Sequence, residues 1–318
     1  MTQPVAIGID IGGTNTAYGI ISRHGEILIK GSLPTTGHAT PRDYVAALKK
    51  ELSLTIETAG IENIAGIGIG APNGSFLTGE IIFAPNLPWS GVIPLVKLME
   101  EAFGLKATLN NDANAAAIGE MIYGAAKGTK DFVLVTLGTG LGSGFVANGQ
   151  MIYGYDGFAG ELGHVIAVRD GRKCNCGRNG CLERYASATG IVITADLWLE
   201  ERDDLTILRS HRGKLTAKMI QDAAQQGDTF ALELYEFTGK MLGQVLADVV
   251  AITSPEAFIF FGGLARGGDL ILKPTRKYME ENILHIYKNK VTLLQSTLPD
   301  ADAAILGASA LVWETPNP

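Results

Sequence analysis

Cysteine is scarce in this chain, and long apolar runs are absent. The 318 residues contain three cysteines, an odd number confined to positions 174 to 181, which excludes the paired-cysteine framework of a small secreted protein. No apolar run reaches the ~20 residues of a membrane-spanning helix. The segment before Val5 lacks the charged and apolar regions of a signal peptide. The sequence therefore predicts a cytoplasmic protein with no membrane partner.

Positive charge is also in short supply. Lys and Arg number 26 against 33 Asp and Glu, a net charge of −7, and a nucleic-acid partner would require a basic face. ATP remains a compatible ligand, because it needs only a local positive potential and Mg²⁺. With 46% hydrophobic and 19% charged residues, the composition is that of a folded protein, and the length predicts two domains.

Glycine, in contrast, is abundant, with 40 residues. Near the N-terminus an apolar strand, Val5–Ile11, leads into the turn Gly12-Gly13-Thr14-Asn15 and then into a second strand, Ala17–Ser22. A Rossmann or P-loop site needs a helix directly after its glycines, and here a strand follows instead. The pattern therefore excludes those two kinds of nucleotide site for this turn.

The same pattern recurs further along the chain. The strand Phe132–Leu137 is followed by the turn Gly138-Thr139-Gly140, and a returning strand starts at Gly144. The repeat predicts two related half-domains facing each other, with turns whose backbone N–H groups and hydroxyls meet phosphate. Two unrelated β-hairpins are the alternative, since glycine-rich hairpin turns are common.

Hydrophobic periodicity predicts an α/β chain with several further elements. Strands are expected at 64–69, 106–109 and 258–261. Helices are expected at 41–60, 92–103, 113–123, 185–201, 216–226, 228–252, 268–281 and 303–312, the last amphipathic enough to pack back on a domain. No linker marks a boundary, and we place a small domain at 1–112, completed by 303–318, and a large domain at 113–302.

One histidine and the three cysteines form a candidate metal site. His164, Cys174, Cys176 and Cys181 supply one imidazole and three thiolates, a closed tetrahedral set typical of structural zinc. The Cys-x-Cys spacing is tighter than that of a DNA-reading finger. A cluster of free thiols beside a coincidental histidine is the alternative. Nearby cations are expected to soften the charge of the thiolates: Arg172, Lys173 and Arg178.

Carboxylates and amides mark a second candidate site. Asp112 follows a strand where a helix begins, beside Asn111, and its carboxylate could accept the proton of an attacking hydroxyl. Simple N-capping of the helix is the alternative. Glu161 and Glu183 flank the cysteine segment on either side. Such groups suit the neighbouring hydroxyls of a hexose.

At these motifs the chain resembles the ROK family of repressors, open reading frames and sugar kinases, and within it the glucokinase-like members. Asp10-Ile11-Gly12-Gly13-Thr14 is similar to the family's first phosphate loop, and the stretch from Gly138 to His164 is similar to its signature region. The three cysteines and Glu183 match its zinc motif, and Gly262-Gly263 is similar to its adenosine-contacting turn. The resemblance covers essentially the whole chain.

The resemblance implies an actin-like ATPase (ribonuclease H-like) fold of two α/β domains with a central cleft, and ATP-dependent phosphorylation of a free hexose with Mg²⁺ and a structural Zn²⁺. Asp112 would be the catalytic base. It would also contact the sugar, together with Asn86, Asn111, Glu161, His164 and Glu183. ATP would be bound by Asp10, Gly12, Gly13, Thr14, Asn15, Gly138, Thr139, Gly140, Gly262 and Gly263. Asn15 departs from the lysine that often follows the Gly-Gly-Thr, which leaves charge neutralisation more to Mg²⁺.

The resemblance leaves several alternatives open. Glucose is the expected sugar, because Glu161 and Glu183 both suit unsubstituted hydroxyls, but N-acetylmannosamine, N-acetylglucosamine, allose and fructose kinases share most of these residues. The family's repressors carry an N-terminal helix-turn-helix, for which the strand at Val5 leaves no room. A sugar-sensing protein without catalysis would be expected to lack the base. The resemblance also implies a homo-oligomer, a dimer or a tetramer.

The zinc segment carries one further expectation. Zinc should order the loop that holds Glu161 and Glu183, so that loss of the metal weakens sugar binding. The phosphate turns lie elsewhere in the sequence, so the affinity for ATP should change much less.

Overall fold

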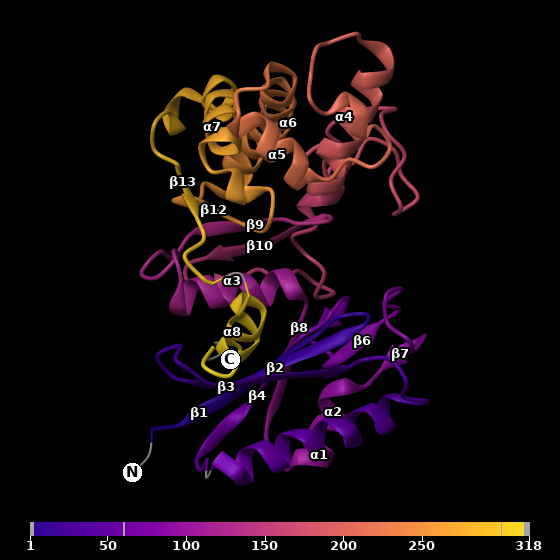
Figure 1. Cartoon of the computed structure of the whole chain (residues 1–318). Helices are drawn as coiled ribbons and strands as arrows, with labels where there is room; N and C mark the ends of the chain where they lie inside the picture. Colours follow the sequence, from indigo (N-terminus) through magenta and orange to yellow (C-terminus); the bar gives the residue numbers. More distant parts are fainter. Residues whose placement is uncertain (1–2, 60, 300, 315–318) are drawn as a thin grey trace. The chain divides into compact units, whose positions relative to one another are not determined.

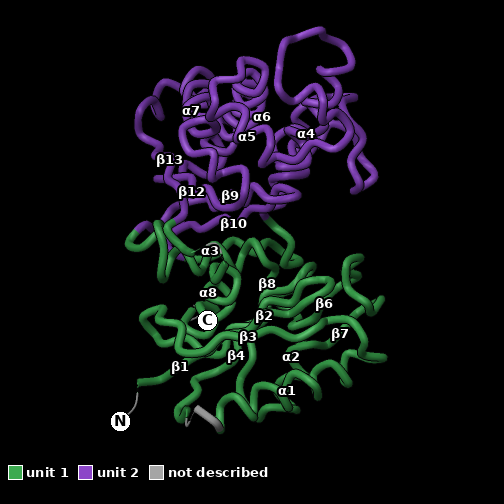
Figure 2. Tube along the Cα trace, in the orientation of Figure 1, with its two compact units in different colours: residues 1–128, 150–159, 297–318 green, residues 129–149, 160–296 purple. Residues whose placement is uncertain are grey.

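The computed structural model describes residues 3–59, 61–299 and 301–314 and divides the chain into two compact units (Figure 2). Unit 1 comprises residues 1–128, 150–159 and 297–318, and unit 2 comprises residues 129–149 and 160–296. This division differs from a boundary at Asp112. Helix α3 (Asp112–Tyr123) belongs to unit 1, because it packs against the C-terminal helix α8 (Ala303–Ala310) of the same unit.

Unit 1 is built on a five-stranded sheet covered by helices on both faces (Figure 1). Helices α1 (Pro41–Ala59) and α2 (Leu95–Phe103) lie on one face, and α3 and α8 lie on the other. The strand order is β3-β2-β1-β4-β8, with β1 antiparallel to β2 and parallel to β4. The strands are β1 (Val5–Ile11), β2 (Asn15–Ser22), β3 (Ile27–Pro34), β4 (Ile64–Gly70) and β8 (Ala107–Asn110); a small separate sheet contains β5 (Gly74–Ser75), β6 (Glu80–Ile82) and β7 (Val92–Ile93).

An alternation of isoleucine and glycine explains how this sheet holds helices on both faces. Successive side chains of a strand point to opposite faces. In β1 and β4 the isoleucines, such as Ile7 and Ile67, enter the core shared with α1 and α2. The glycines between them face α8: a Cβ on Gly8 or Gly68 would overlap the carbonyl oxygens of that helix. Glycine therefore lets α8 lie directly against the sheet backbone.

Helix α8 shows why the prediction of an amphipathic C-terminal helix is wrong. It is made of Ala, Ile, Leu, Gly and Ser, and nearly every residue from Ala303 to Ala310 is buried. One side approaches the glycines of the sheet, and the other approaches α3, where Gly119 and Gly307 meet at close range. A helix enclosed on both sides needs small apolar residues all round rather than a polar stripe.

The second five-stranded sheet repeats the topology of the first. Its order is β11-β10-β9-β12-β13, and β9 is antiparallel to β10 and parallel to β12. The related half-domains predicted from the glycine turns are thus confirmed in topology, since each turn joins the first two antiparallel strands of its sheet. The strands are β9 (Phe132–Leu137), β10 (Leu141–Ala147), β11 (Gln150–Met151), β12 (Ala257–Phe261) and β13 (Thr292–Gln295).

Four helices of unit 2 cover its sheet (Figure 1): α4 (Ala188–Glu201), α5 (Ala217–Gln225), α6 (Thr229–Thr253) and α7 (Asp269–Asn282). The core is formed by the alternating apolar residues of β9 and β12 packed against these helices, with Leu242 and Leu246 of α6 among the fully buried side chains. In the part of the chain that the structure describes, no helix combines the length and apolar character needed to cross a membrane. Five single-turn 3-10 helices complete the described elements: η1 (Leu162–His164), η2 (Leu182–Arg184), η3 (Arg209–His211), η4 (Ala265–Gly267) and η5 (His285–Tyr287).

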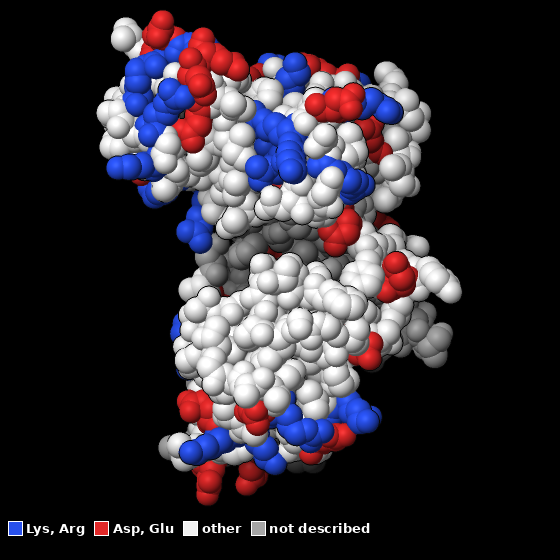
Figure 3. Space-filling view, turned by 90° about the vertical axis from the view of Figure 1, so that its right-hand side faces the viewer, with Lys and Arg blue, Asp and Glu red and all other residues white. Residues whose placement is uncertain are grey.

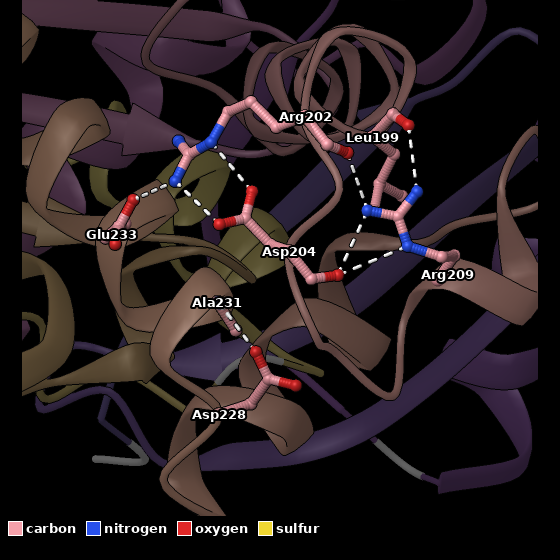
Figure 4. A network of polar contacts seen from close by, with 7 residues as sticks. All are labelled: Leu199, Arg202, Asp204, Arg209, Asp228, Ala231 and Glu233. Carbon is pink, nitrogen blue, oxygen red and sulfur yellow. Dashed lines mark hydrogen bonds and ion pairs between the residues drawn. The ribbon is translucent and has the colours of Figure 1, made fainter.

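The connection between α4 and α5 contains only a single turn of 3-10 helix and is fixed by polar contacts (Figure 4). Arg202 forms ion pairs with Asp204 at 2.7 Å and with Glu233 of α6 at 2.6 Å. Arg209 donates to the carbonyl of Leu199 at 3.1 Å. These contacts hold the connection against α4 and α6.

Candidate active site and metal centre

The first glycine turn is a tight reversal between β1 and β2. The Gly12 N–H donates to the Asn15 carbonyl at 3.0 Å. Gly13 lies against the backbone of Asn86, whose carbonyl oxygen a Cβ at Gly13 would overlap. Neither glycine has a positive φ. Glycine is therefore required at position 13 by the close approach of the Asn86 backbone and not by backbone conformation. The structure thereby brings Asn86, distant in sequence, beside the first turn, where Thr14 and Asn15 are exposed.

Asp10 and Asp112 lie near one another in unit 1. Asp10 is near the end of β1, on the sheet face that carries α3, and Asp112 is the first residue of α3. Burial, together with the negative charge of Asp112, raises the pKa of Asp10 to about 6. A buried carboxylate with a second carboxylate nearby forms a setting in which a cation would be stabilised. Asp112 itself is exposed.

Asn111, and not Asp112, caps helix α3. The Asn111 side chain accepts from the Asn114 N–H at 2.7 Å, with extended backbone as an N-cap requires. The Asp112 carboxylate accepts only from the N–H of Ala113, at 2.8 Å, among the contacts of the described residues. One oxygen of Asp112 therefore has no partner within that part of the chain. The capping alternative is accounted for by Asn111.

A buried polar network supports this helix start, and the sequence did not reveal it. Asn110 is buried and donates to the Tyr153 hydroxyl at 3.0 Å, while its Oδ1 accepts from Asn114 at 3.1 Å. Tyr153 stacks on Phe76, with ring centroids 4.3 Å apart, and its hydroxyl lies 3.4 Å from the Glu314 carboxylate. The cluster of asparagines around 110–114 was the only sequence signal, because the partners lie far along the chain.

The second glycine turn joins β9 to β10, and its Gly138 and Thr139 leave space for a ligand. The Gly138 N–H donates to the Gly140 carbonyl at 3.1 Å. Among the residues that the structure describes, a Cβ at Gly138 would meet no heavy atom within 4 Å, and Thr139 is exposed. Beside this turn, after β12, Gly262 has a φ of +102° and lies against the Leu137 backbone, while Gly263 has open space around it. Unit 2 thus brings together the two glycine turns assigned to ATP in this half of the chain.

Glu161 and Glu183 flank the cysteine segment with different environments. Glu161 is exposed, just before η1, and Gly163 of that turn approaches the Leu141 backbone too closely for any side chain. Glu183 is half-buried, and its Oε2 accepts from the Leu141 N–H at 3.0 Å. One oxygen of Glu183 is therefore engaged with the second glycine turn, a contact that the sequence did not predict.

The candidate metal ligands converge on one point. The ligand atoms of His164, Cys174, Cys176 and Cys181 all lie within 4.8 Å of one another. The sulfurs of Cys176 and Cys181 are 3.6 Å apart, and Nδ1 of His164 is 3.8 Å from the Cys174 sulfur. Two sulfurs bound to one zinc at ~2.3 Å in a tetrahedron lie about 3.8 Å apart. The four residues thus fit a structural zinc ion, and the alternative of unconnected thiols does not explain the convergence.

The neighbouring cations play different parts from one another. Arg178 donates to the His164 carbonyl at 2.8 Å, and it lies beside Cys176, where backbone hydrogen bonding from Arg178 lowers the pKa of the thiol to about 6. Arg172 instead lies over the Tyr185 ring and donates to the Arg184 carbonyl at 2.8 Å. Arg178 is therefore placed to soften the thiolate charge, while Arg172 ties the segment to the residues before α4.

The site residues predicted from sequence are divided between the two units. Unit 1 holds Asp10, Gly12, Gly13, Thr14, Asn15, Asn86, Asn111 and Asp112; unit 2 holds Gly138, Thr139, Gly140, Glu161, His164, Cys174, Cys176, Cys181, Glu183, Gly262 and Gly263. Within each unit the predicted residues gather at the glycine turn and the segments beside it.

Comparison with known proteins extends these observations. A model of the ROK family matches residues 6–315. The chain is 36% identical over 319 residues to a glucokinase from Halalkalibacterium halodurans, covering 98% of this chain and 96% of that protein. It is 35% identical over 311 residues to an N-acetylmannosamine kinase from Shigella boydii, covering 96% and 97%. A solved ROK family glucokinase from Streptomyces griseus, in complex with glucose and AMPPNP, matches with a TM-score of 0.79 at 33% identity, covering 96% and 98%. The similarity confirms the predicted actin-like ATPase fold of two α/β domains.

Proposed function

The chain belongs to the ROK family, and we propose that it transfers the γ-phosphoryl group of ATP to a hydroxyl of a free hexose, with glucose as the principal substrate. The observation that carries the proposal is the exposed carboxylate of Asp112, which starts α3 beside Asp10 and leaves one oxygen available. Phosphoryl transfer needs chiefly positioning, charge neutralisation and one base near the nucleophile. The similarity to glucokinases over nearly the whole chain supports the choice of sugar.

The roles of the other residues follow from their surroundings. Asn111 uses its side-chain oxygen in the cap, so its amide N–H groups remain to donate to a sugar oxygen. His164 turns Nδ1 toward the cysteines, which leaves Nε2 for a sugar hydroxyl. Asn86, Glu161 and Glu183 would complete the sugar contacts. Zinc, when bound, supplies structural order here and no chemistry.

Asp10 and the glycine turns would form the nucleotide site. Backbone N–H groups of the two hairpin turns would face phosphate oxygens, and the Gly262-Gly263 turn would contact the adenosine. The Asp10 carboxylate is the group of unit 1 best suited to hold Mg²⁺, because it is an oxygen ligand whose charged form is disfavoured until a cation is near. Because position 15 is Asn15 and not a lysine, Mg²⁺ would neutralise the phosphate charge.

A coupled assay of ADP release across a panel of hexoses tests the proposal. We expect kcat/KM to be highest for glucose among glucose, N-acetylmannosamine, N-acetylglucosamine, allose and fructose. A maximum at N-acetylmannosamine would keep the kinase activity but replace the substrate. Absence of ADP release with every sugar would leave the sugar-sensing alternative and contradict catalysis.

The partners expected besides the hexose are further copies of this chain. On the face seen in Figure 3, Lys and Arg are interspersed with Asp and Glu, and the net charge is −7, both of which favour a small-molecule ligand over nucleic acid. A dimer or tetramer remains a prediction, and sedimentation equilibrium of the purified protein would measure it.

Substitution of Gly138 is expected to weaken ATP binding without lowering the stability of the fold. No described residue lies within 4 Å of a Cβ at Gly138, and the φ of Gly138 is not positive. Gly138→Val should therefore unfold at nearly the wild-type temperature. Its ATP KM should rise by about tenfold or more, because the branched side chain obstructs phosphate. Gly13→Val is the contrasting variant, because it collides with the Asn86 backbone and should lose stability as well. An unchanged ATP KM in Gly138→Val would remove this turn from the nucleotide site.

Asp10→Asn should stabilise the protein while impairing its activity. The folded pKa of about 6 lies above the ordinary 3.8, so folding disfavours the charged form; this cost is fully present above about pH 6 and fades as the pH falls toward 4. Removing the charge should therefore raise the free energy of unfolding at pH 8 by on the order of 2 kcal/mol. Chemical denaturation at pH 8 and pH 4 would measure a gain at the former that shrinks at the latter, while Mg²⁺-dependent turnover falls. An equal gain in the free energy of unfolding at pH 8 and pH 4 would contradict the raised pKa of Asp10.

A further inference from the structure

The second glycine turn is held from outside by one short segment of unit 2. The Glu183 Oε2 accepts from the Leu141 N–H at 3.0 Å. The Ala188 N–H donates to the Gly138 carbonyl at 2.9 Å, and the Thr189 hydroxyl donates to the Thr139 carbonyl at 2.7 Å. Residues 183–189 therefore bond to both ends of the turn and to its centre.

The same segment is continuous with the metal ligands. Cys181 pairs with Ile166 as an isolated bridge, and Glu183 follows two residues later in η2. The Ser187 hydroxyl donates to the Glu183 carbonyl at 2.7 Å and also caps helix α4. The first residue of α4 is Ala188, whose N–H donates to the Gly138 carbonyl. An ordered path of short-range contacts thus runs from the cysteines to the turn.

Other hydrogen bonds act on the residues that flank the turn: the Leu264 N–H donates to the Leu137 carbonyl at 3.1 Å, and the Gly142 N–H donates to the Thr136 hydroxyl at 3.1 Å. Within the turn, the Gly138 N–H donates to the Gly140 carbonyl, and no described residue lies within 4 Å of a Cβ position at Gly138. Gly140, by contrast, lies directly against the Glu183 carboxylate, where any Cβ would overlap Oε2. Glycine at position 140 therefore lets the carboxylate reach the Leu141 N–H, and an ionised acceptor makes a stronger hydrogen bond than a neutral one.

We infer that Glu183 is a positioning residue for the phosphate-binding turn, and that Thr189 shares this role, so that the metal-bound segment orders the nucleotide site as well as the sugar site. This inference rests on the proposed function, because it takes the β9–β10 turn to face ATP. One carboxylate oxygen of Glu183 holds the turn and the other remains for the sugar. The two substrate sites of unit 2 then share a single side chain.

Nucleotide binding without sugar separates this role from a purely sugar-binding one. Calorimetric titration with AMPPNP and Mg²⁺, in zinc-loaded full-length protein, should show Glu183→Ala weakened by about tenfold. Glu183→Gln should recover most of that loss, since its amide oxygen still accepts from Leu141. Glu161→Ala is the matched control: its carboxylate has no contact with the turn among the described residues, so it should weaken sugar binding and leave the AMPPNP affinity at the wild-type value.

Hydrogen exchange provides a readout that needs no ligand. In nucleotide-free protein the peptide covering 138–142 should exchange faster in Glu183→Ala than in wild type, and close to the wild-type rate in Glu183→Gln. Thr189→Val, which keeps side-chain volume and loses only the hydroxyl, should also weaken AMPPNP binding and serves if Glu183→Ala does not fold. Wild-type exchange and wild-type AMPPNP affinity in both Glu183→Ala and Thr189→Val would overturn the inference. A wild-type protein that protects this peptide but binds no AMPPNP would instead contradict the proposed function.

Discussion

Replacing Asp112 with asparagine is expected to lower turnover on glucose by about 10²- to 10⁴-fold, the usual share of a positioned general base. The amide cannot accept the proton of the attacking hydroxyl, but it has the size of the carboxylate and can keep the contact with the Ala113 N–H. The helix should remain intact, because Asn111 provides the cap. Sugar affinity, measured by calorimetry, should therefore stay near the wild-type value while kcat collapses.

Two comparisons make this result decisive. Asn111→Ala removes the cap and a proposed sugar contact, so it should lower both stability and sugar affinity, whereas Asp112→Asn should lower neither by much. Single-turnover measurements would show whether the chemical step itself is slowed. Turnover within a few-fold of wild type in Asp112→Asn would show that another group accepts the proton.

Loss of the zinc ligand Cys176 is expected to weaken the binding of both substrates. Cys176→Ala should purify without stoichiometric zinc, because the three remaining ligands no longer close the tetrahedron. The sugar KM should rise because Glu161 and His164 are no longer held, and the ATP KM should rise by about tenfold because the segment after Cys181 supports the glycine turn. Sequence position alone had suggested that ATP would be little affected, and the contacts of Glu183 and Thr189 give the reason to expect otherwise.

Elemental analysis and steady-state kinetics on the same preparations would test this expectation. Wild-type protein treated with a chelator, then supplied again with zinc, serves as the control: both KM values should rise on removal and return on addition. A rise confined to the sugar KM would favour the original expectation that the phosphate turns are independent of the metal. Wild-type protein without any bound metal would return the cysteines to the alternative of a free-thiol cluster.

The metal ligands, the glycine turns and the start of helix α3 could be predicted from the sequence without a structure. The metal ligands fall within one short stretch from His164 to Cys181, and their donor types indicate structural zinc. The glycine hairpins were readable because a strand, and not a helix, follows each turn. Asn111 and Asp112 could be placed at the start of a helix, although only the hydrogen bonds decided which of them caps it.

The sequence by itself therefore determined the donor atoms, the turns and the repeated strand pattern, since these depend on residues close together in the chain. The tertiary structure decided which distant groups meet. It enclosed α8 between the glycines of β1 and β4 and helix α3, and it brought Tyr153 to Asn110 and Glu314 to Tyr153. It also buried Asp10 near Asp112, and burial together with that neighbouring charge raises the pKa of Asp10. It also brought Glu183 to Leu141 across a long stretch of chain. Such contacts depend on the path of the whole backbone and on the space that glycines leave open, and neither is encoded in any single stretch of residues.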